Sequence, residues 1–302
     1  MNIKNKKLFV SMLVLLCAIL TAAYVFLFVL SDDRQPPEIH IDSEILNVSV
    51  TANEKALLKG VTATDDVDGD VTSSILIEGF SKFTAKNTAY ITYVAYDSAG
   101  NVSKATRTVK FRDYTPPVFG QTKALVFASN TAPDVLSFVS ATDKIDGDIS
   151  DRVKGTLLSE ATSLNYPGEH QIEFRVTNSM GDTQRITLPV EVYDAGTYNA
   201  TVELSEYLVY VKQGGEFRPE SYLQNLVVGT KEYPLVADWK AGTMVYVNRY
   251  VNPSINPTIN IINVEMKSDV DTTTPGLYSV TYMVDLGGRY KGYTRLNVVV
   301  EG

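Results

Sequence analysis

The sequence predicts an all-β protein, in which tandem antiparallel β-sandwich modules follow one N-terminal apolar helix. Three observations predict this class: one apolar run near the start, an acidic turn that occurs twice, and short alternating apolar and polar segments separated by turn residues. The 302 residues suffice for three small domains. The only cysteine, Cys17, lies in the apolar run, so the modules must fold without intramolecular disulfides.

The apolar run predicts a transmembrane signal-anchor helix. Residues 8–30 carry no charge, and at about 1.5 Å per residue a helix of this length spans roughly 34 Å, enough to cross a bilayer core. Three lysines precede it and two aspartates follow it. By the positive-inside rule we expect residues 1–7 to form a cytoplasmic tail and the bulk of this single-pass cell-membrane protein to be extracellular.

A cleavable signal peptide is the alternative, with cleavage after the small residues 21–23. Cleavage there would leave the apolar segment 24–30 exposed, so we favour the anchor. A lipoprotein attached through Cys17 is disfavoured because two leucines precede this cysteine. No sorting motif or second apolar span precedes Gly302, so we expect the N-terminal helix to be the only anchor.

Paired prolines mark the start of the modules. Residues 31–36 form a linker that leads into Pro36-Pro37, and the pair recurs at Pro116-Pro117. Proline and the residue before it favour extended geometry, so each pair ends one segment and begins a strand. The predicted modules are module 1 (residues 37–113), module 2 (115–194) and module 3 (198–302).

Two signatures repeat between the modules. The acidic turn at residues 65–72 returns at 143–150, and a hairpin with its turn at 97–101 returns with its turn at 178–182. Module 3 has the late hairpin but no acidic turn, which leaves a different β-fold open for its first half. Short strands at even spacing, with no helical period after the apolar run, are typical of sandwiches of immunoglobulin-like (Ig-like) type.

The residues Ala63 to Thr72 and Tyr93 to Asn101 resemble the bacterial Ig-like repeat family of Gram-positive cell-surface proteins, which is also found attached to some pesticidal crystal proteins. The resemblance covers modules 1 and 2 and the last third of module 3. It implies a β-sandwich displayed outside the cell as a spacer or binding module. It implies no catalytic activity and no defined ligand site.

The acidic turns are either calcium sites or turn formers. Carboxylate oxygens are the ligands that calcium prefers, but aspartates in tight turns also accept hydrogen bonds from nearby backbone amides, which is the interpretation we favour. The candidate metal ligands are Asp65, Asp66, Asp68 and Asp70 in module 1 and Asp143, Asp146 and Asp148 in module 2.

Catalytic constellations are lacking in the sequence. His40 and His170 are the only histidines, and they belong to different modules, so no Ser-His-Asp triad or histidine metal site fits within one domain. Carboxylates on Asp-Gly turns are usually solvated, whereas a general acid needs burial to raise its pKa. We therefore expect no enzyme, and no cofactor other than the structural calcium considered above.

Charge restricts the partners. Residues 31–302 carry a formal charge of −11, because the three N-terminal lysines offset the total of −8. An acidic surface argues against nucleic acid as a partner.

We expect a non-enzymatic, membrane-anchored stalk for adhesion or protein–protein interaction at the envelope, its partner an unknown envelope protein. The alternative is a surface protein that binds carbohydrate, peptidoglycan or another wall polysaccharide through aromatic residues of module 3. The candidate binding residues are Trp239, Tyr246 and Tyr250. Because no proline stiffens residues 194–197, we expect more bending there than between modules 1 and 2.

Overall fold

The computed structural model describes residues 3–25, 33–158, 163–240, 243–248, 261–262, 264–287 and 290–302. Among them one helix, α1 (Ile3–Tyr24), is long and apolar enough to cross a membrane. Its stretch Lys6–Tyr24 has a mean hydropathy of 2.1, and none of it is buried against the rest of the chain. A membrane anchor and an N-terminal signal sequence share these properties.

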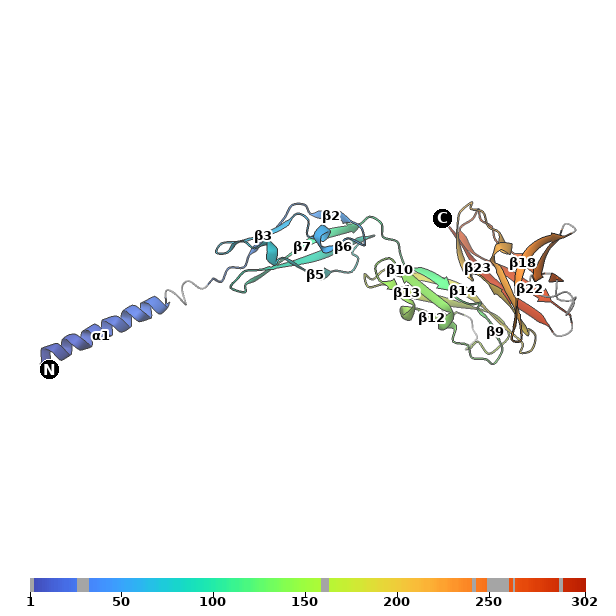
Figure 1. Cartoon of the computed structure of the whole chain (residues 1–302), viewed down its shortest axis with the longest axis horizontal. Helices are drawn as coiled ribbons and strands as arrows, with labels where there is room; N and C mark the ends of the chain where they lie inside the picture. The colour runs from blue at the N-terminus through green and yellow to red at the C-terminus, as the bar shows by residue number, and fades with distance from the viewer. Residues whose placement is uncertain are drawn as a thin grey trace. The chain divides into compact units, whose positions relative to one another are not determined.

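The chain divides into two compact units, Met1–Tyr114 and Thr115–Gly302 (Figure 1). Module 1 belongs to the first unit, and modules 2 and 3 belong to the second. Apart from α1, the described residues are mostly β-strands in several small sheets, as the sequence predicts.

Module 1 is a sandwich of two sheets. Its elements are β1 (Glu38–Ile41), β2 (Ile45–Val48), α2 (Glu54–Leu57), β3 (Val61–Asp65), β4 (Gly69–Asp70), η2 (Thr72–Ser74), β5 (Leu76–Phe80), β6 (Thr88–Tyr96) and β7 (Val102–Phe111). The strand orders are β1-β3-β4 and β2-β7-β6-β5. Every second residue of β6, from Ala89 to Ala95, is fully buried, because successive side chains of a strand point to opposite faces.

Module 2 repeats this plan. Its elements are β8 (Val118–Gln121), β9 (Val126–Ala128), η3 (Val135–Phe138), β10 (Val139–Asp143), β11 (Gly147–Asp148), η4 (Ser150–Arg152), β12 (Lys154–Leu157), β13 (Gly168–Thr177) and β14 (Thr183–Tyr193). The orders β11-β10-β8 and β12-β13-β14-β9 match those of module 1 strand for strand. At the position of Gly168, module 1 has Asn87, whose φ of +57° is the left-handed conformation that asparagine tolerates best among non-glycine residues.

Module 3 contains the same pairings and an insertion. Its elements are β15 (Ala200–Leu204), β16 (Leu208–Lys212), η5 (Pro219–Tyr222), β17 (Leu223–Val228), β18 (Lys231–Lys240), β19 (Thr243–Asn248), β20 (Ile261–Ile262), β21 (Val264–Ser268), β22 (Gly276–Asp285) and β23 (Lys291–Glu301). β15 pairs with β17, β16 pairs with β23, and β21, β22 and β23 follow in order. The first half of module 3 therefore follows the plan of the other modules, and β18 to β20 stand where those modules have the acidic turn.

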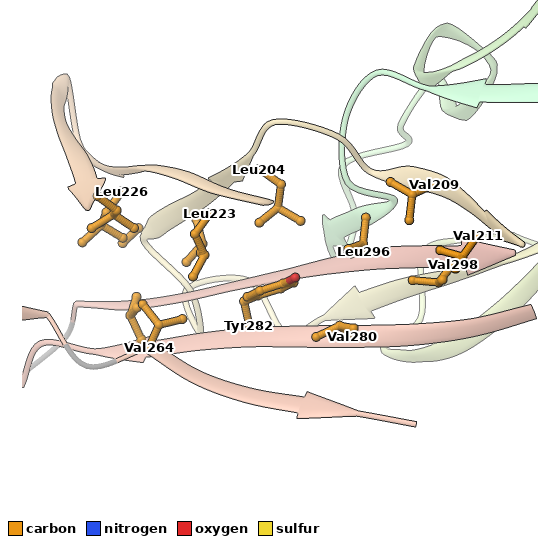
Figure 2. Close-up of a cluster of buried hydrophobic side chains, with 14 residues drawn as sticks. Leu204, Val209, Val211, Leu223, Leu226, Val264, Val280, Tyr282, Leu296 and Val298 are labelled. Carbon is orange, nitrogen blue, oxygen red and sulfur yellow. The ribbon is translucent and has the colours of Figure 1, made fainter. Parts of the chain in front are cut away.

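The core of module 3 lies between these two groups of strands. Figure 2 shows Tyr282 and Val280 of β22 facing leucines of β15 and β17, with Leu296 and Val298 of β23 beside them. Tyr282 is fully buried, and its hydroxyl donates a hydrogen bond to the Pro219 carbonyl over 2.7 Å. This partner is needed because a buried hydroxyl without one is costly.

Each module contains parallel strand pairing, which the prediction of antiparallel sheets did not include. Module 3 contains it twice, because β15 also pairs in parallel with β23 at Ala200 and Gly292. β2 runs parallel to β7, β9 to β14 and β16 to β23. The reason in module 1 is a change of sheet. β1 pairs with β3 in one sheet, and the chain then crosses to the other sheet, where β2 lies beside the last strand, β7. The equivalent strands β8 and β9 follow this route too, whereas in module 3 both β15 and β16 pair with β23 within one continuous sheet.

Modules 2 and 3 share an interface within the second unit. Leu208 of module 3 is buried in the core of module 2, and the Tyr210 hydroxyl donates to the Phe119 carbonyl over 3.0 Å. Arg295 pairs with Glu169 at 2.8 Å. These contacts restrict the bending that we expected at residues 194–197.

Candidate functional site

Both acidic turns are formed by aspartates that accept backbone hydrogen bonds. Asp65 Oδ1 accepts from the amides of Val67 and Asp68, each over 2.9 Å, and Asp70 Oδ1 accepts from the Thr72 amide over 2.9 Å. In module 2, Asp143 accepts from the equivalent two amides and Asp148 from that of Ser150. The hydrogen bonds from Thr72 lower the pKa of Asp70, and those from Ser150 lower the pKa of Asp148.

The aspartate directly before the glycine of each turn, Asp68 or Asp146, joins the acidic turn to the hairpin turn. The Asp68 carboxylate accepts from the Ser98 amide over 2.6 Å and from the Ser98 hydroxyl over 2.8 Å. Asp146 accepts in the same way from Ser179, over 2.7 and 2.6 Å, and also pairs with Arg152. Burial raises the pKa of Asp146, but the hydrogen bonds from Ser179 and Arg152 outweigh it and the pKa is lowered.

The two modules differ at the first aspartate. In module 2 the Asn178 side-chain amide donates to Asp143 Oδ2 over 3.1 Å. Module 1 has Asp97 at the position of Asn178, and an ionised carboxylate has no proton to donate. Asp65 Oδ2, the counterpart of Asp143 Oδ2, is buried without a hydrogen-bond partner.

Asp65 also belongs to a cluster of carboxylates. Asp33, Asp65 and Asp66 each place one carboxylate oxygen within 4.8 Å of the other two, and they are the one group of three metal-ligand side chains found among the described residues. Asp33 Oδ2 is also buried without a partner. Of the predicted ligands, Asp65 and Asp66 thus come together, whereas Asp68, Asp70, Asp143, Asp146 and Asp148 lie outside the cluster.

Sequence reasoning did not include Asp33, which was assigned to the linker. A signal was available, since Asp33 precedes Pro36-Pro37 by the same interval at which Asp113 precedes Pro116-Pro117. Asp113 has a different role, because it accepts hydrogen bonds from the Ser49 hydroxyl and the Val50 amide. Only the tertiary structure distinguishes these two aspartates.

The structure describes only the backbone of two of the three aromatic residues predicted to bind carbohydrate. Trp239 is on β18, in register with Met244, and Tyr246 is on β19, in register with Ala237. Their side chains, and the whole of Tyr250, lie outside the described residues.

A different aromatic set lines a groove of about 510 Å³ between modules 2 and 3. The Tyr198 ring stacks on Tyr293 with 5.5 Å between centroids, and it meets Tyr193 edge-on at 4.9 Å. Burial raises the pKa of both Tyr193 and Tyr293. Lys123 and Glu203 also line the groove, which therefore combines ring faces with charged and hydrogen-bonding groups.

The histidines stay apart. His40 is exposed on β1 and contacts the Thr64 hydroxyl at 3.2 Å, whereas His170 is buried on β13 and contacts the Tyr166 carbonyl at 2.9 Å. The two histidines belong to different modules.

Comparison with known proteins finds limited similarity. No family model matches the chain. The chain is 28% identical over 151 residues to the pesticidal crystal protein Cry22Aa of Bacillus thuringiensis, covering 48% of this chain and 20% of that protein. It is 33% identical over 100 residues to an uncharacterised 81.3 kDa protein of Acholeplasma phage L2, covering 33% of this chain and 13% of that protein. The chain thus spans a fifth or less of these relatives.

Among solved structures, human CDH23 domains EC21–23 are 14% identical, with 88% of this chain and 100% of that one covered and a TM-score of 0.20. A ZmpB structure from Clostridium perfringens, with an M60 catalytic domain and CBM51 domains, is 12% identical over 87% of this chain and 43% of that one, with a TM-score of 0.26.

Proposed function

We propose that this chain is a non-enzymatic cell-surface protein, anchored by α1, whose β-sandwich modules form a stalk for adhesion or protein–protein interaction. The observation that carries the proposal is an apolar helix with no burial against protein, followed by β-sandwich modules with buried apolar cores. A helix of this length and hydropathy can cross a bilayer core. In modules 1 and 2 the hydrogen bonds from Ser98 to Asp68 and from Ser179 to Asp146 hold the acidic turn to the hairpin turn, which supports a mechanical role.

Fractionation of cells that express the full chain tests the anchor. We expect the protein in the membrane fraction, released by detergent but not by high salt, and digested by protease added outside intact cells. The N-terminal residues 1–7 should remain on the mature protein. Recovery in the soluble fraction, or a mature N-terminus after residue 23, would contradict the anchor.

A matched pair of variants sharpens this test. Leu13→Arg and Leu16→Arg together place two charges in the middle of the span, at about 2.5–3.5 kcal/mol each, and should abolish membrane retention. Leu13→Ile with Leu16→Ile should leave it unchanged.

The groove between modules 2 and 3 favours a second candidate function, the binding of a wall polysaccharide. Tyrosine rings offer apolar faces to sugar rings, and the polar groups beside them can bind hydroxyls. The stacked pair Tyr198 and Tyr293 carries this candidate.

Sedimentation of the detergent-solubilised full chain with purified cell wall tests it. Tyr198→Ala and Tyr293→Ala should each weaken retention at least tenfold, whereas Tyr90→Ala, at an exposed position of module 1, should not. Equal retention of all three variants would exclude the groove and leave the stalk proposal intact.

A further inference from the structure

We propose that Asp33, Asp65 and Asp66 form a calcium site that fastens the segment after the apolar helix to module 1. Their carboxylate oxygens lie within 4.8 Å of one another. Calcium takes six to eight oxygen ligands at about 2.3–2.6 Å, so one ion between these oxygens can reach all three, with water completing its shell.

The strongest indication is the buried oxygen of Asp65. The residue is 9% exposed, and its Oδ1 is occupied by the turn amides, while Oδ2 has no hydrogen-bond donor. Asp33 Oδ2 is buried without a donor as well. Buried carboxylate oxygens without donors are costly, and a cation held by these two carboxylates would offset that cost.

Module 2 serves as an internal control for this interpretation. Its Asp143 has the same two turn amides on Oδ1 and receives the Asn178 amide on Oδ2, so its carboxylate is satisfied by the protein alone. In module 1, Asp97 instead accepts from the Asn101 amide and side chain, each over 2.8 Å. Replacement of an amide by a carboxylate at this position removes a donor and adds a negative charge, which favours a cation.

Asp33 is held in place by the hairpin turn. The Asn101 side chain donates to the Asp33 carbonyl over 3.2 Å, and Asp33 Oδ1 accepts from the Gln35 amide over 3.0 Å. Asp66 is exposed, so the ion has a route from solvent. A bound ion would therefore hold residues 33–37, directly before β1, against module 1, and the stability of this contact would respond to calcium.

Calorimetric titration of CaCl2 into the full chain, purified in uncharged detergent and freed of metal with a chelator, tests the site. We expect one ion per chain, with a dissociation constant in or below the range of about 0.1–1 mM found for extracellular calcium modules. Asp33→Asn and Asp65→Asn should each weaken binding at least tenfold. Asp70→Asn, in the same turn but outside the cluster, should change it less than twofold. Hydrogen exchange at residues 33–37 should slow on addition of calcium.

A double variant that gives module 1 the residues of module 2 distinguishes loss of the calcium site from misfolding of module 1. Asp97→Asn with Asn101→Asp installs the pair found at Asn178 and Asp182, so the double variant should fold, should be more stable than the parent without calcium, and should lose at least tenfold in calcium affinity. Absence of saturable binding by the parent up to about 10 mM, well above the range of such modules, would overturn the proposal. So would equal losses from Asp70→Asn and Asp65→Asn, or unchanged affinity in the double variant.

Discussion

The Asn297 side-chain amide donates a hydrogen bond to Gln121 Oε1 over 2.8 Å, and both residues are buried. Asn297 lies on β23 of module 3 and Gln121 on β8 of module 2, so the bond connects the two modules of the second unit. Gln121 in turn donates from Nε2 to the Lys123 carbonyl over 2.7 Å. A buried polar bridge of this kind specifies one arrangement of the two modules, because any other leaves these groups without partners.

Gln121→Ala should destabilise the second unit by about 1–3 kcal/mol, because it leaves the Asn297 amide buried without an acceptor. Urea unfolding can be followed by the fluorescence of Trp239, the only tryptophan, which lies on β18 of this unit. The control is Asn225→Ala, which removes a part-buried bond to Glu203 within module 3 and should cost less than about 1 kcal/mol. Equal destabilisation by the two variants would show that the bond between Asn297 and Gln121 contributes no more than a part-buried bond within module 3.

Tyr93→Phe should destabilise module 1 by about 1–2 kcal/mol. The Tyr93 hydroxyl is buried and donates to the Leu57 carbonyl over 2.8 Å, and module 2 has Phe174 at the equivalent position, so the ring itself should pack without strain. Hydrogen exchange of residues 37–113 measures the loss. Tyr90→Phe, at an exposed position, should have little effect on hydrogen exchange. Similar effects from the two variants would contradict a stabilising role of the Tyr93 hydroxyl.

Acid should weaken module 2 through Asp146. Its pKa is lowered below the ordinary value of 3.8, so the unfolded state binds a proton at a higher pH than the folded state does. The stabilisation is complete above the unfolded pKa and is lost as pH falls through the folded pKa.

Asp146→Asn should therefore flatten the dependence of the unfolding midpoint on pH below about 4. Ser179→Ala removes one of the two serine donors and should have the same effect to a smaller degree. If both variants keep the pH dependence of the parent, the hydrogen bonds between Ser179 and Asp146 do not contribute to the acid sensitivity of module 2.

Alkali should weaken the second unit through Tyr210. Burial raises the pKa of Tyr210 from 10.0 to about 12. A raised pKa means that the folded state keeps its proton longer than the unfolded state, so stability is complete below pH 10 and falls as pH rises from 10 towards 12. Tyr210→Phe should lower stability at neutral pH by about 1 kcal/mol through loss of the bond to Phe119, and should make the alkaline decline shallower. If the stability of Tyr210→Phe falls as steeply with rising pH as that of the parent, other tyrosines cause the alkaline destabilisation.

The turns show why much of the fold was predictable. Asp65 and Asp70 accept the backbone hydrogen bonds expected of aspartates in tight turns, and Asn87 has a left-handed φ that asparagine tolerates well. These properties arise from groups close together in the chain, so local chemistry suffices to infer them. The parallel pairings were not predictable in this way, because they depend on which distant strand a short strand lies beside after the chain crosses over.

The sequence by itself determined the class of the protein: one apolar helix, then β-sandwich modules whose order follows from repeated turns and period-two strands. Only the tertiary structure decided that Asp33 joins Asp65 and Asp66, that Asn178 satisfies one acidic turn while its counterpart in the other has no donor, and that Gln121 and Asn297 connect two modules. The physical reason is distance along the chain. Turn and strand preferences act between near neighbours, whereas the satisfaction of a buried oxygen depends on partners tens to hundreds of residues away, whose identity is known only when the chain has folded.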